Sequence, residues 1–262
     1  MLLSVVVPTW NSEKLLKEFC QSWAAEGSSW SRLVVVDDGS TDGTIELLSE
    51  WAEHPNLLFM RQGNAGPGVA RNFGLSAVET PLATFADVDD LVDWRGLSDL
   101  ATEMRRHPSV DVLTSLLDGD VYAPSDITQR PATGFSRVQF LRTRLAVWGR
   151  IYRTSLLHGL DPLFPATRAG EDVVGTVRIA SACQDFGYSR APFYQHRPSQ
   201  STLTRRTDYS LLAMESLRVV KDLQVERSLK CYALSASAKY LALRGDLAAA
   251  LQCSGLAVRS LG

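Results

Sequence analysis

The sequence predicts an α/β protein in which a mainly parallel sheet is flanked by helices and followed by a helical C-terminal region. Short valine-rich runs alternate with amphipathic segments over about the first hundred residues, the pattern of parallel strands joined by helical crossovers. Polar residues directly follow several of these runs, and from Tyr209 onward the pattern contains helices only. A chain of 262 residues is long enough for such a sheet and an appendage.

The predicted strands are short, apolar and closed by polar or turn-forming residues. They span residues 3–7, 33–36, 57–60, 82–86 and 110–116. Apolar residues at helical spacing, preceded by capping residues such as Ser12 and Asp42, predict helices after the first two strands. A third helix is expected within residues 67–78, after a glycine-rich turn.

The remainder of the chain is less regular before it becomes helical. Residues 119–133 are predicted to be a loop, residues 140–157 mostly helical or mixed, and residues 171–182 a helix. Breaks near residues 226–228 and at Gly245-Asp246 divide the C-terminal region, and the second break predicts a helical hairpin.

The composition excludes several classes of protein. It is 45% hydrophobic and 21% charged with a net charge of -2, which is ordinary for a soluble globular protein and gives no basic excess for nucleic-acid binding. No apolar run approaches the ~20 residues of a membrane-spanning helix, and the N-terminus lacks signal-peptide features. We therefore expect a cytoplasmic protein, with peripheral contact at the inner face of the plasma membrane left open. Four scattered cysteines predict small buried residues in a reducing compartment: Cys20, Cys183, Cys231 and Cys253.

Polar groups follow the first, second and fourth predicted strands. They are Pro8-Thr9, Asp37-Asp38 and the run from Asp87 to Asp90. Because ligands of parallel sheets bind beyond the carboxyl ends of the strands, these groups predict a ligand site at one edge of the sheet.

The run Asp87-Val88-Asp89-Asp90 holds three carboxylates in four positions after an apolar strand. Like charges raise one another's pKa unless a cation neutralises them, and oxygen-rich clusters suit Mg²⁺ or Mn²⁺. Spacing alone leaves two interpretations open, a metal site and a solvated acidic turn.

The other polar segments have ordinary structural interpretations as well. Residues 37–44 suit a turn and helix cap, and residues 63–68 lack the signatures of phosphate-binding and dinucleotide-binding loops. Glu171-Asp172 suits the first turn of a helix, where acidic residues interact favourably with the helix dipole. His196 and Arg197 suit an exposed surface.

Together, however, these segments resemble family 2 glycosyltransferases with the GT-A fold. The resemblance runs through ordered motifs: residues 4–11, residues 34–44, residues 64–74 with Ala70-Arg71-Asn72, and Asp87-Val88-Asp89 as a D-x-D sequence. Weaker likenesses follow at residues 147–153, at Gly170-Glu171-Asp172 and at residues 194–201, where Gln195 departs from the family pattern.

The resemblance implies an inverting glycosyltransferase that uses a nucleotide diphosphate sugar, with UDP favoured, Mn²⁺ or Mg²⁺ as cofactor, and Asp172 as catalytic base. Asp38 would accept a hydrogen bond from the base, Asp87 would bind the ribose, and Asp89 would ligate the metal, with His196 as a second candidate ligand. The nucleotide-sugar contacts implied as a set are Pro8, Thr9, Asn11, Asp38, Arg71, Asp87, Val88, Arg150 and Arg197.

The same resemblance divides the chain into a catalytic domain and an extension. Residues 1–206 would form the GT-A domain, with residues 1–95 binding the nucleotide and residues 96–206 the acceptor, and residues 207–262 would be helical. The acceptor would be a glycan or a lipid-linked saccharide, and a homodimer is left open. Two other functions stay open, a sugar nucleotidyltransferase and a non-catalytic scaffold in a glycan-assembly complex.

Overall fold

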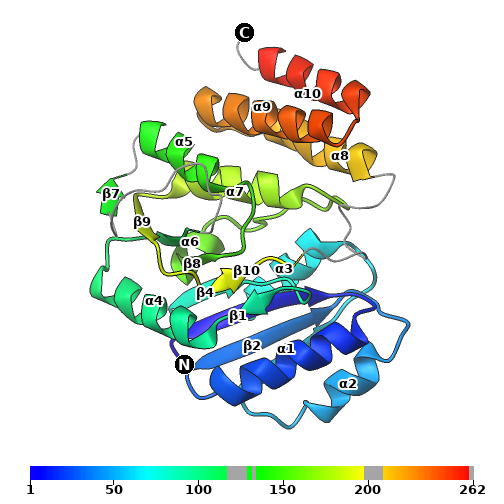
Figure 1. Cartoon of the computed structure of the whole chain (residues 1–262), viewed down its shortest axis with the longest axis vertical. Coiled ribbons are helices and arrows are strands. Elements are labelled where there is room, and N and C mark those ends of the chain that lie inside the picture. The colour runs from blue at the N-terminus through cyan, green and yellow to red at the C-terminus, as the bar shows by residue number, and fades with distance from the viewer. Residues whose placement is uncertain (117–128, 132–133, 198–208, 260–262) are drawn as a thin grey trace.

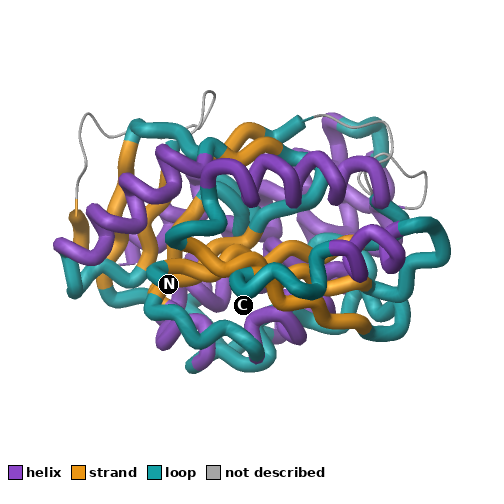
Figure 2. The backbone as a smooth tube through the Cα atoms, turned by 90° about the horizontal axis from the view of Figure 1, so that it is seen from below, coloured by secondary structure: helices purple, strands orange, loops and turns teal. Residues whose placement is uncertain are grey.

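The structure, a computed structural model, describes residues 1–116, 129–131, 134–197 and 209–259. Its centre is an eight-stranded sheet with the order β3-β2-β1-β4-β8-β6-β9-β7, accompanied by a small sheet of β5 and β10. Helices cover both faces of the large sheet (Figures 1 and 2). The predicted α/β fold class is confirmed.

The strands are short. Their bounds are β1 Leu3–Thr9, β2 Ser31–Asp37, β3 Leu57–Arg61, β4 Leu82–Phe85, β5 Leu91–Val92, β6 Val112–Ser115, β7 Gln129–Pro131, β8 Arg150–Arg153, β9 Asp185–Ser189 and β10 Tyr194–Gln195. β3, β2, β1 and β4 are parallel, whereas β8 runs antiparallel to both β4 and β6. The four parallel strands are the first four strands predicted from the sequence.

The helices follow the same order along the chain. Their bounds are α1 Glu13–Glu26, α2 Thr44–Glu50, α3 Pro67–Ser76, α4 Trp94–Arg106, α5 Gly134–Thr143, α6 Thr154–His158, α7 Glu171–Ala182, α8 Tyr209–Asp222, α9 Arg227–Leu243 and α10 Leu247–Arg259. The predicted helix at residues 171–182 and both C-terminal breaks are confirmed.

Alternating side chains of each central strand pack on opposite faces of the sheet. On β1, Val5 and Val7 enter a core with α1, α2 and α4, whereas Val6 enters the core with α3, α6 and α7. Since side chains alternate with a period of two along a strand, a strand that is apolar on both faces must be covered on both. This is why the valine-rich runs lie at the centre of the sheet.

The two strands of the small sheet, β5 and β10, were not predicted, and three strands of the large sheet also differ from the sequence-based expectation. β7 lies inside the predicted loop of residues 119–133, most of which is outside the described residues. β8 lies within residues 140–157, where the sequence predicted helical or mixed structure, because only Ile151 and Tyr152 separate its two terminal arginines. β9 was not predicted, since Asp185 and Gly187 interrupt its apolar pattern.

The three C-terminal helices lie beyond α5 and α7, at the end of the molecule opposite α1 and α2 (Figure 1). Leu217 of α8 and Leu234 of α9 belong to the same apolar core as Val174 of α7. The predicted boundary at residue 206 lies outside the described residues, so the division into domains stays a prediction. Within the described ranges, no helix has the length and hydropathy needed to cross a membrane.

Gly74 allows α3 to pack closely on the sheet. A Cβ atom there would lie 2.7 Å from Val6 Cγ1 and 2.9 Å from Val36 Cγ2. We expect Gly74→Ala to lower the free energy of unfolding by about 1–3 kcal/mol, because overpacking forces neighbouring side chains and backbone apart. Urea denaturation measures this change.

Gly255 of α10 supplies the matched control. A Cβ atom there has no neighbour within 4 Å, so Gly255→Ala should leave stability unchanged or raise it by up to about 1 kcal/mol through helix propensity. Equal stability of the Gly74→Ala and Gly255→Ala variants would contradict the packing account.

Candidate functional site

A cavity of about 480 Å³ lies beyond the carboxyl ends of the first strands. Pro8 and Thr9 reach it from β1, Asp38 from the loop after β2, and Asp87 to Asp89 from the loop after β4. Seven of the predicted contacts line this cavity: Pro8, Thr9, Asp38, Arg71, Asp87, Val88 and Asp89. The structure therefore brings together residues as far apart in the sequence as Pro8 and Asp89, as the position of the strand ends predicted.

Asp38 holds the glycine-rich turn that closes one side of this first cavity. Its Oδ1 accepts hydrogen bonds of 2.8 Å from Gln62 Nε2 and from the main-chain N–H of Ala65, and its Oδ2 accepts one of 2.8 Å from the N–H of Gly66. Gly66 has a φ of 99°, which favours glycine, and Pro67 then begins α3. The buried carboxylate thus fixes the approach to α3, on which Arg71 lies.

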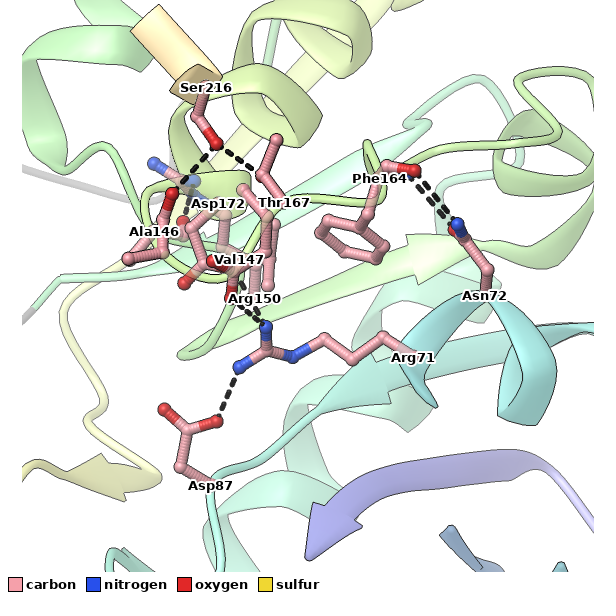
Figure 3. Close-up of polar contacts among 12 residues, drawn as sticks. Arg71, Asn72, Asp87, Ala146, Val147, Arg150, Phe164, Thr167, Asp172 and Ser216 are labelled. Atoms are coloured by element: carbon pink, nitrogen blue, oxygen red, sulfur yellow. Dashed lines mark hydrogen bonds and ion pairs between the residues drawn. The ribbon is translucent and has the colours of Figure 1, made fainter. Parts of the chain in front are cut away.

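Arg71 is the buried centre of the site (Figure 3). Its Nη2 donates to Asp87 Oδ1 at 2.7 Å, and its Nη1 donates to Glu171 Oε1 at 2.7 Å and to Asp172 Oδ1 at 3.1 Å. These three carboxylates raise the pKa of Arg71 against the opposing effect of burial. One guanidinium therefore joins the acid at the end of β4 to the two acids at the start of α7.

The start of α7 determines where its acids lie. Gly170 precedes the helix with a φ of 73°, and Glu171 and Asp172 occupy its first turn. The helix dipole favours acids at these positions. Because this turn faces Arg71, Glu171 and Asp172 occupy positions that the helix dipole favours and at the same time belong to the site.

A second cavity of about 650 Å³ adjoins the first. The two share the wall formed by Pro67, Arg71, Asp87 and Asp89. Asp172 and His196 line the second cavity. The predicted base is thus separated from the Asp38 side of the site by the shared wall.

The Asp172 carboxyl has a pKa raised to about 7. Burial is the main cause, and the neighbouring charges of Glu171 and Asp87 act in the same direction, whereas Arg71 and a hydrogen bond from the Val147 main chain oppose them. A carboxyl with such a pKa can accept a proton near neutral pH, which an ordinary aspartate does poorly.

Asp90 organises the segment that covers the D-x-D loop, a role that the sequence did not reveal. Its buried carboxylate accepts from Tyr194 Oη at 2.5 Å and from the Arg197 N–H at 2.8 Å, and lies 3.0 Å from His196 Nδ1. The Trp148 ring stacks with the rings of both Tyr194 and His196, with centroid distances of 5.1 and 5.5 Å. The third carboxylate of the run was the only sequence signal, and it resembled an acidic turn.

Asp89 differs from its neighbours because, among the described residues, its carboxylate has no ion pair and no hydrogen bond to another residue, and it accepts only from its own main-chain N–H. It is half-buried and lines both cavities, and burial together with the charge of Asp87 raises its pKa. Among the described residues, no three or more histidine, cysteine, aspartate or glutamate side chains are arranged so that they could hold a metal ion by themselves. One carboxylate without an ion pair fits a cation whose other ligands are diphosphate oxygens and water, an arrangement common for Mg²⁺.

Three predicted donor contacts do not line either cavity. Arg150 is fully buried, and its guanidinium donates to Thr143 Oγ1 and the carbonyl of Arg144. A fully buried guanidinium cannot contact the donor as expected, and these hydrogen bonds instead hold the segment after α5 in place. Asn11 instead accepts from the N–H of Thr41, and Arg197 Nε donates to the carbonyl of Asp89.

Two further residues at the site were missed. Glu171 and Asp87 each lie 2.7 Å from Arg71. The sequence analysis assigned a role to Asp172 but none to Glu171. Arg168 lines the first cavity and donates to the side chain and carbonyl of Asn64. The Glu-Asp pair was a signal for the first, whereas Arg168 lies in an irregular segment with no recognisable pattern.

Comparison with known proteins places this site in a family. The model of glycosyl transferase family 2 matches residues 4–152. The poly(ribitol-phosphate) beta-N-acetylglucosaminyltransferase TarS of Staphylococcus aureus is 32% identical over 188 residues, which cover 68% of this chain and 32% of TarS. The glycosyltransferase YibD of Escherichia coli is 25% identical over 227 residues, covering 80% of this chain and 66% of YibD.

Solved structures share the fold. The crystal structure of TarS residues 1–349 has a TM-score of 0.66 and 26% identity, covering 90% of this chain and 71% of that one. The mannosyltransferase PcManGT of Pyrobaculum calidifontis has a TM-score of 0.61 at 21% identity, covering 98% of this chain and 75% of that one, and shows the fold alone. The chain spans about a third of the length of TarS. Since the family model covers more than half of the chain, including Asp38, Asp87 and Asp89, this protein belongs to glycosyl transferase family 2.

Proposed function

We propose that this chain is an inverting glycosyltransferase that moves a sugar from a nucleotide diphosphate sugar, with UDP favoured, to a hydroxyl group of a glycan or lipid-linked saccharide. The observation that carries the proposal is the shared wall of Arg71, Asp87 and Asp89 between the two cavities. A donor on one side and an acceptor on the other would meet at this wall.

The first cavity suits the donor nucleotide. Its volume of about 480 Å³ lies in the usual range for small-molecule sites, and Pro8, Thr9 and Asp38 provide an apolar edge with polar groups behind it. Structures of TarS residues 1–349 in complex with UDP and with UDP-GlcNAc support a uridine nucleotide. In this proposal Asp38 fixes the pocket through its three hydrogen bonds, and Asp87 contacts the ribose.

Asp89 would hold a divalent cation, Mn²⁺ or Mg²⁺, together with the diphosphate. Such a cation supplies positive charge that stabilises the nucleotide as a leaving group. The PcManGT complex with GDP-Man and Mn²⁺ supports a divalent metal in this fold. Asp87 is less suited to the cation because Arg71 already binds its Oδ1 at 2.7 Å.

Asp172 would accept the proton of the acceptor hydroxyl from the second cavity. Its raised pKa suits a general base, and its position beyond the shared wall suits attack from the face opposite the leaving nucleotide. A single displacement of this kind inverts the configuration at the anomeric carbon. No enzyme nucleophile is needed.

Release of UDP tests the proposal. The purified chain, incubated with Mn²⁺ and a set of UDP-sugars, should release UDP slowly by hydrolysis, and Asp89→Asn should need a higher Mn²⁺ concentration for the same rate. Asp99→Asn, at an exposed position of α4, is the matched control. Failure to bind or hydrolyse any nucleotide sugar would favour a scaffold, and formation of a nucleotide sugar from a sugar phosphate and UTP would favour a nucleotidyltransferase.

A further inference from the structure

The second cavity extends well beyond the acids of the proposed chemistry. Its far lining comes from the C-terminal helices: Ala213 and Leu217 of α8, and Tyr232, Ala236, Tyr240 and Leu241 of α9. Leu141, Arg142 and Leu145 complete it from α5 and the loop that follows. Its volume of about 650 Å³ exceeds that of the cavity assigned to the donor. This volume has room for much of an acceptor molecule in addition to the hydroxyl group that reacts.

The charges of this cavity are distributed unevenly. Asp87 and Asp89 belong to the wall shared with the donor cavity, and Glu171 and Asp172 lie next to that wall, where they bind Arg71. Arg142 contributes positive charge from α5, at the part of the lining that faces Tyr232. An anionic ligand group would be repelled at the first location and attracted at the second.

Arg142 is available to a ligand in a way that the other lining arginines are not. Arg71 is bound by three carboxylates, and Arg144 donates to the carbonyls of Ser115 and Trp148. Arg142 is exposed, and within the described ranges it makes no hydrogen bond or ion pair. Its guanidinium carbon lies 5.9 Å from the centroid of the Tyr232 ring. An arginine stacked on an aromatic face keeps its fork of N–H donors free for a planar or tetrahedral oxyanion.

We propose that this cavity binds the acceptor and that the acceptor carries an anionic group, a phosphate or a carboxylate, which Arg142 binds. The inference rests on the proposed function, since it takes the second cavity as the acceptor side. Binding of the anion at α5 would direct the rest of the acceptor along Tyr232 and Tyr240 and leave a hydroxyl group at Asp172. The C-terminal helices would thereby select the acceptor while the sheet binds the donor.

Two matched pairs of small probes test the inference by calorimetry on the whole chain with Mn²⁺ and UDP present. Ribitol 5-phosphate is compared with ribitol, and glucuronate with glucose. The wild-type chain should bind at least one anionic probe about tenfold more tightly than its neutral partner, as expected for a charge-assisted hydrogen bond. Preference within the first pair identifies phosphate as the ligand group, and preference within the second identifies carboxylate.

Arg142→Gln should reduce the preference to below about threefold. Arg95→Gln, at an exposed position of α4 outside both cavities, should keep it. The inference is overturned by equal binding within both pairs, by absence of binding of every probe, or by preference that survives in Arg142→Gln. UDP release by the wild-type chain is measured on the same preparation. Because donor hydrolysis does not need the acceptor, UDP release without any preference for an anionic probe overturns the inference about Arg142 but not the proposed function.

Discussion

Asp172→Asn is expected to lower the rate of sugar transfer by about 10²- to 10⁴-fold, the usual contribution of a general base. Donor binding should be retained, because Asp172 lines the second cavity and not the first. The substitution keeps an oxygen for Arg71 and leaves its bonds to Asp87 and Glu171 in place. Steady-state transfer and calorimetric titration with UDP measure the two effects separately.

The matched control for this variant is Asp99→Asn on the exposed side of α4. It changes the same functional group and should transfer sugar at the wild-type rate. If Asp172→Asn retained near-wild-type turnover with its true acceptor, Asp172 would not be the base.

The pH dependence of transfer follows from the same carboxyl. The pKa of Asp172 is raised to about 7, chiefly by burial, and a base must be ionised to act. The rate should therefore increase by about tenfold per pH unit below this value and level off above it. Transfer rates measured across about pH 5.5 to 8.5 test this, and a rate that falls as the pH rises through 7 would contradict the assignment.

Arg71→Met is expected to cause a large loss of both stability and sugar transfer. Removal of this guanidinium leaves Asp87, Glu171 and Asp172 close together without their cation. Breaking a buried ion pair from one side costs about 3–5 kcal/mol, because the remaining charge stays desolvated. We expect a loss of this order in the free energy of unfolding at neutral pH, together with loss of transfer.

Two comparisons isolate the charge effect. Arg32→Met removes a half-buried arginine whose ion pair with the exposed Glu79 measures 3.8 Å, and pairs with a solvent-exposed partner contribute less than about 1 kcal/mol. Adding Glu171→Gln to Arg71→Met should recover part of the lost stability. Urea denaturation that finds Arg71→Met no less stable than Arg32→Met would refute the account of Arg71.

The sequence predicted the first half of the fold because its signals are local. Valine-rich runs such as residues 33–36 must be buried on both sides, and each ends directly at a polar group of the site. β8 and β9 escaped prediction because their short apolar patterns are interrupted by arginine, aspartate or glycine. Their burial depends on neighbouring strands that no local pattern reveals.

The site residues were likewise predicted where a local signal marked them and missed where none did. Strand ends located Asp38, Asp87 and Asp89, whereas only family resemblance singled out Asp172. Contacts between distant segments could not be deduced, so the roles of Asp90 and Glu171 were missed. For Arg150, the motif predicted a contact with the donor that the structure does not show. Its side chain is fully buried and donates hydrogen bonds to Thr143 and Arg144, in and directly after α5.

The central claim is that the cavity at the strand ends binds a nucleotide diphosphate sugar through a cation held by Asp89. Thermal unfolding of the chain with Mn²⁺ and a panel of nucleotide sugars tests it most directly. A donor at a hundred times its Kd should stabilise the fold by about 2.7 kcal/mol, only when Mn²⁺ is present and less in Asp89→Asn. Identical unfolding temperatures with and without every nucleotide sugar would contradict the claim.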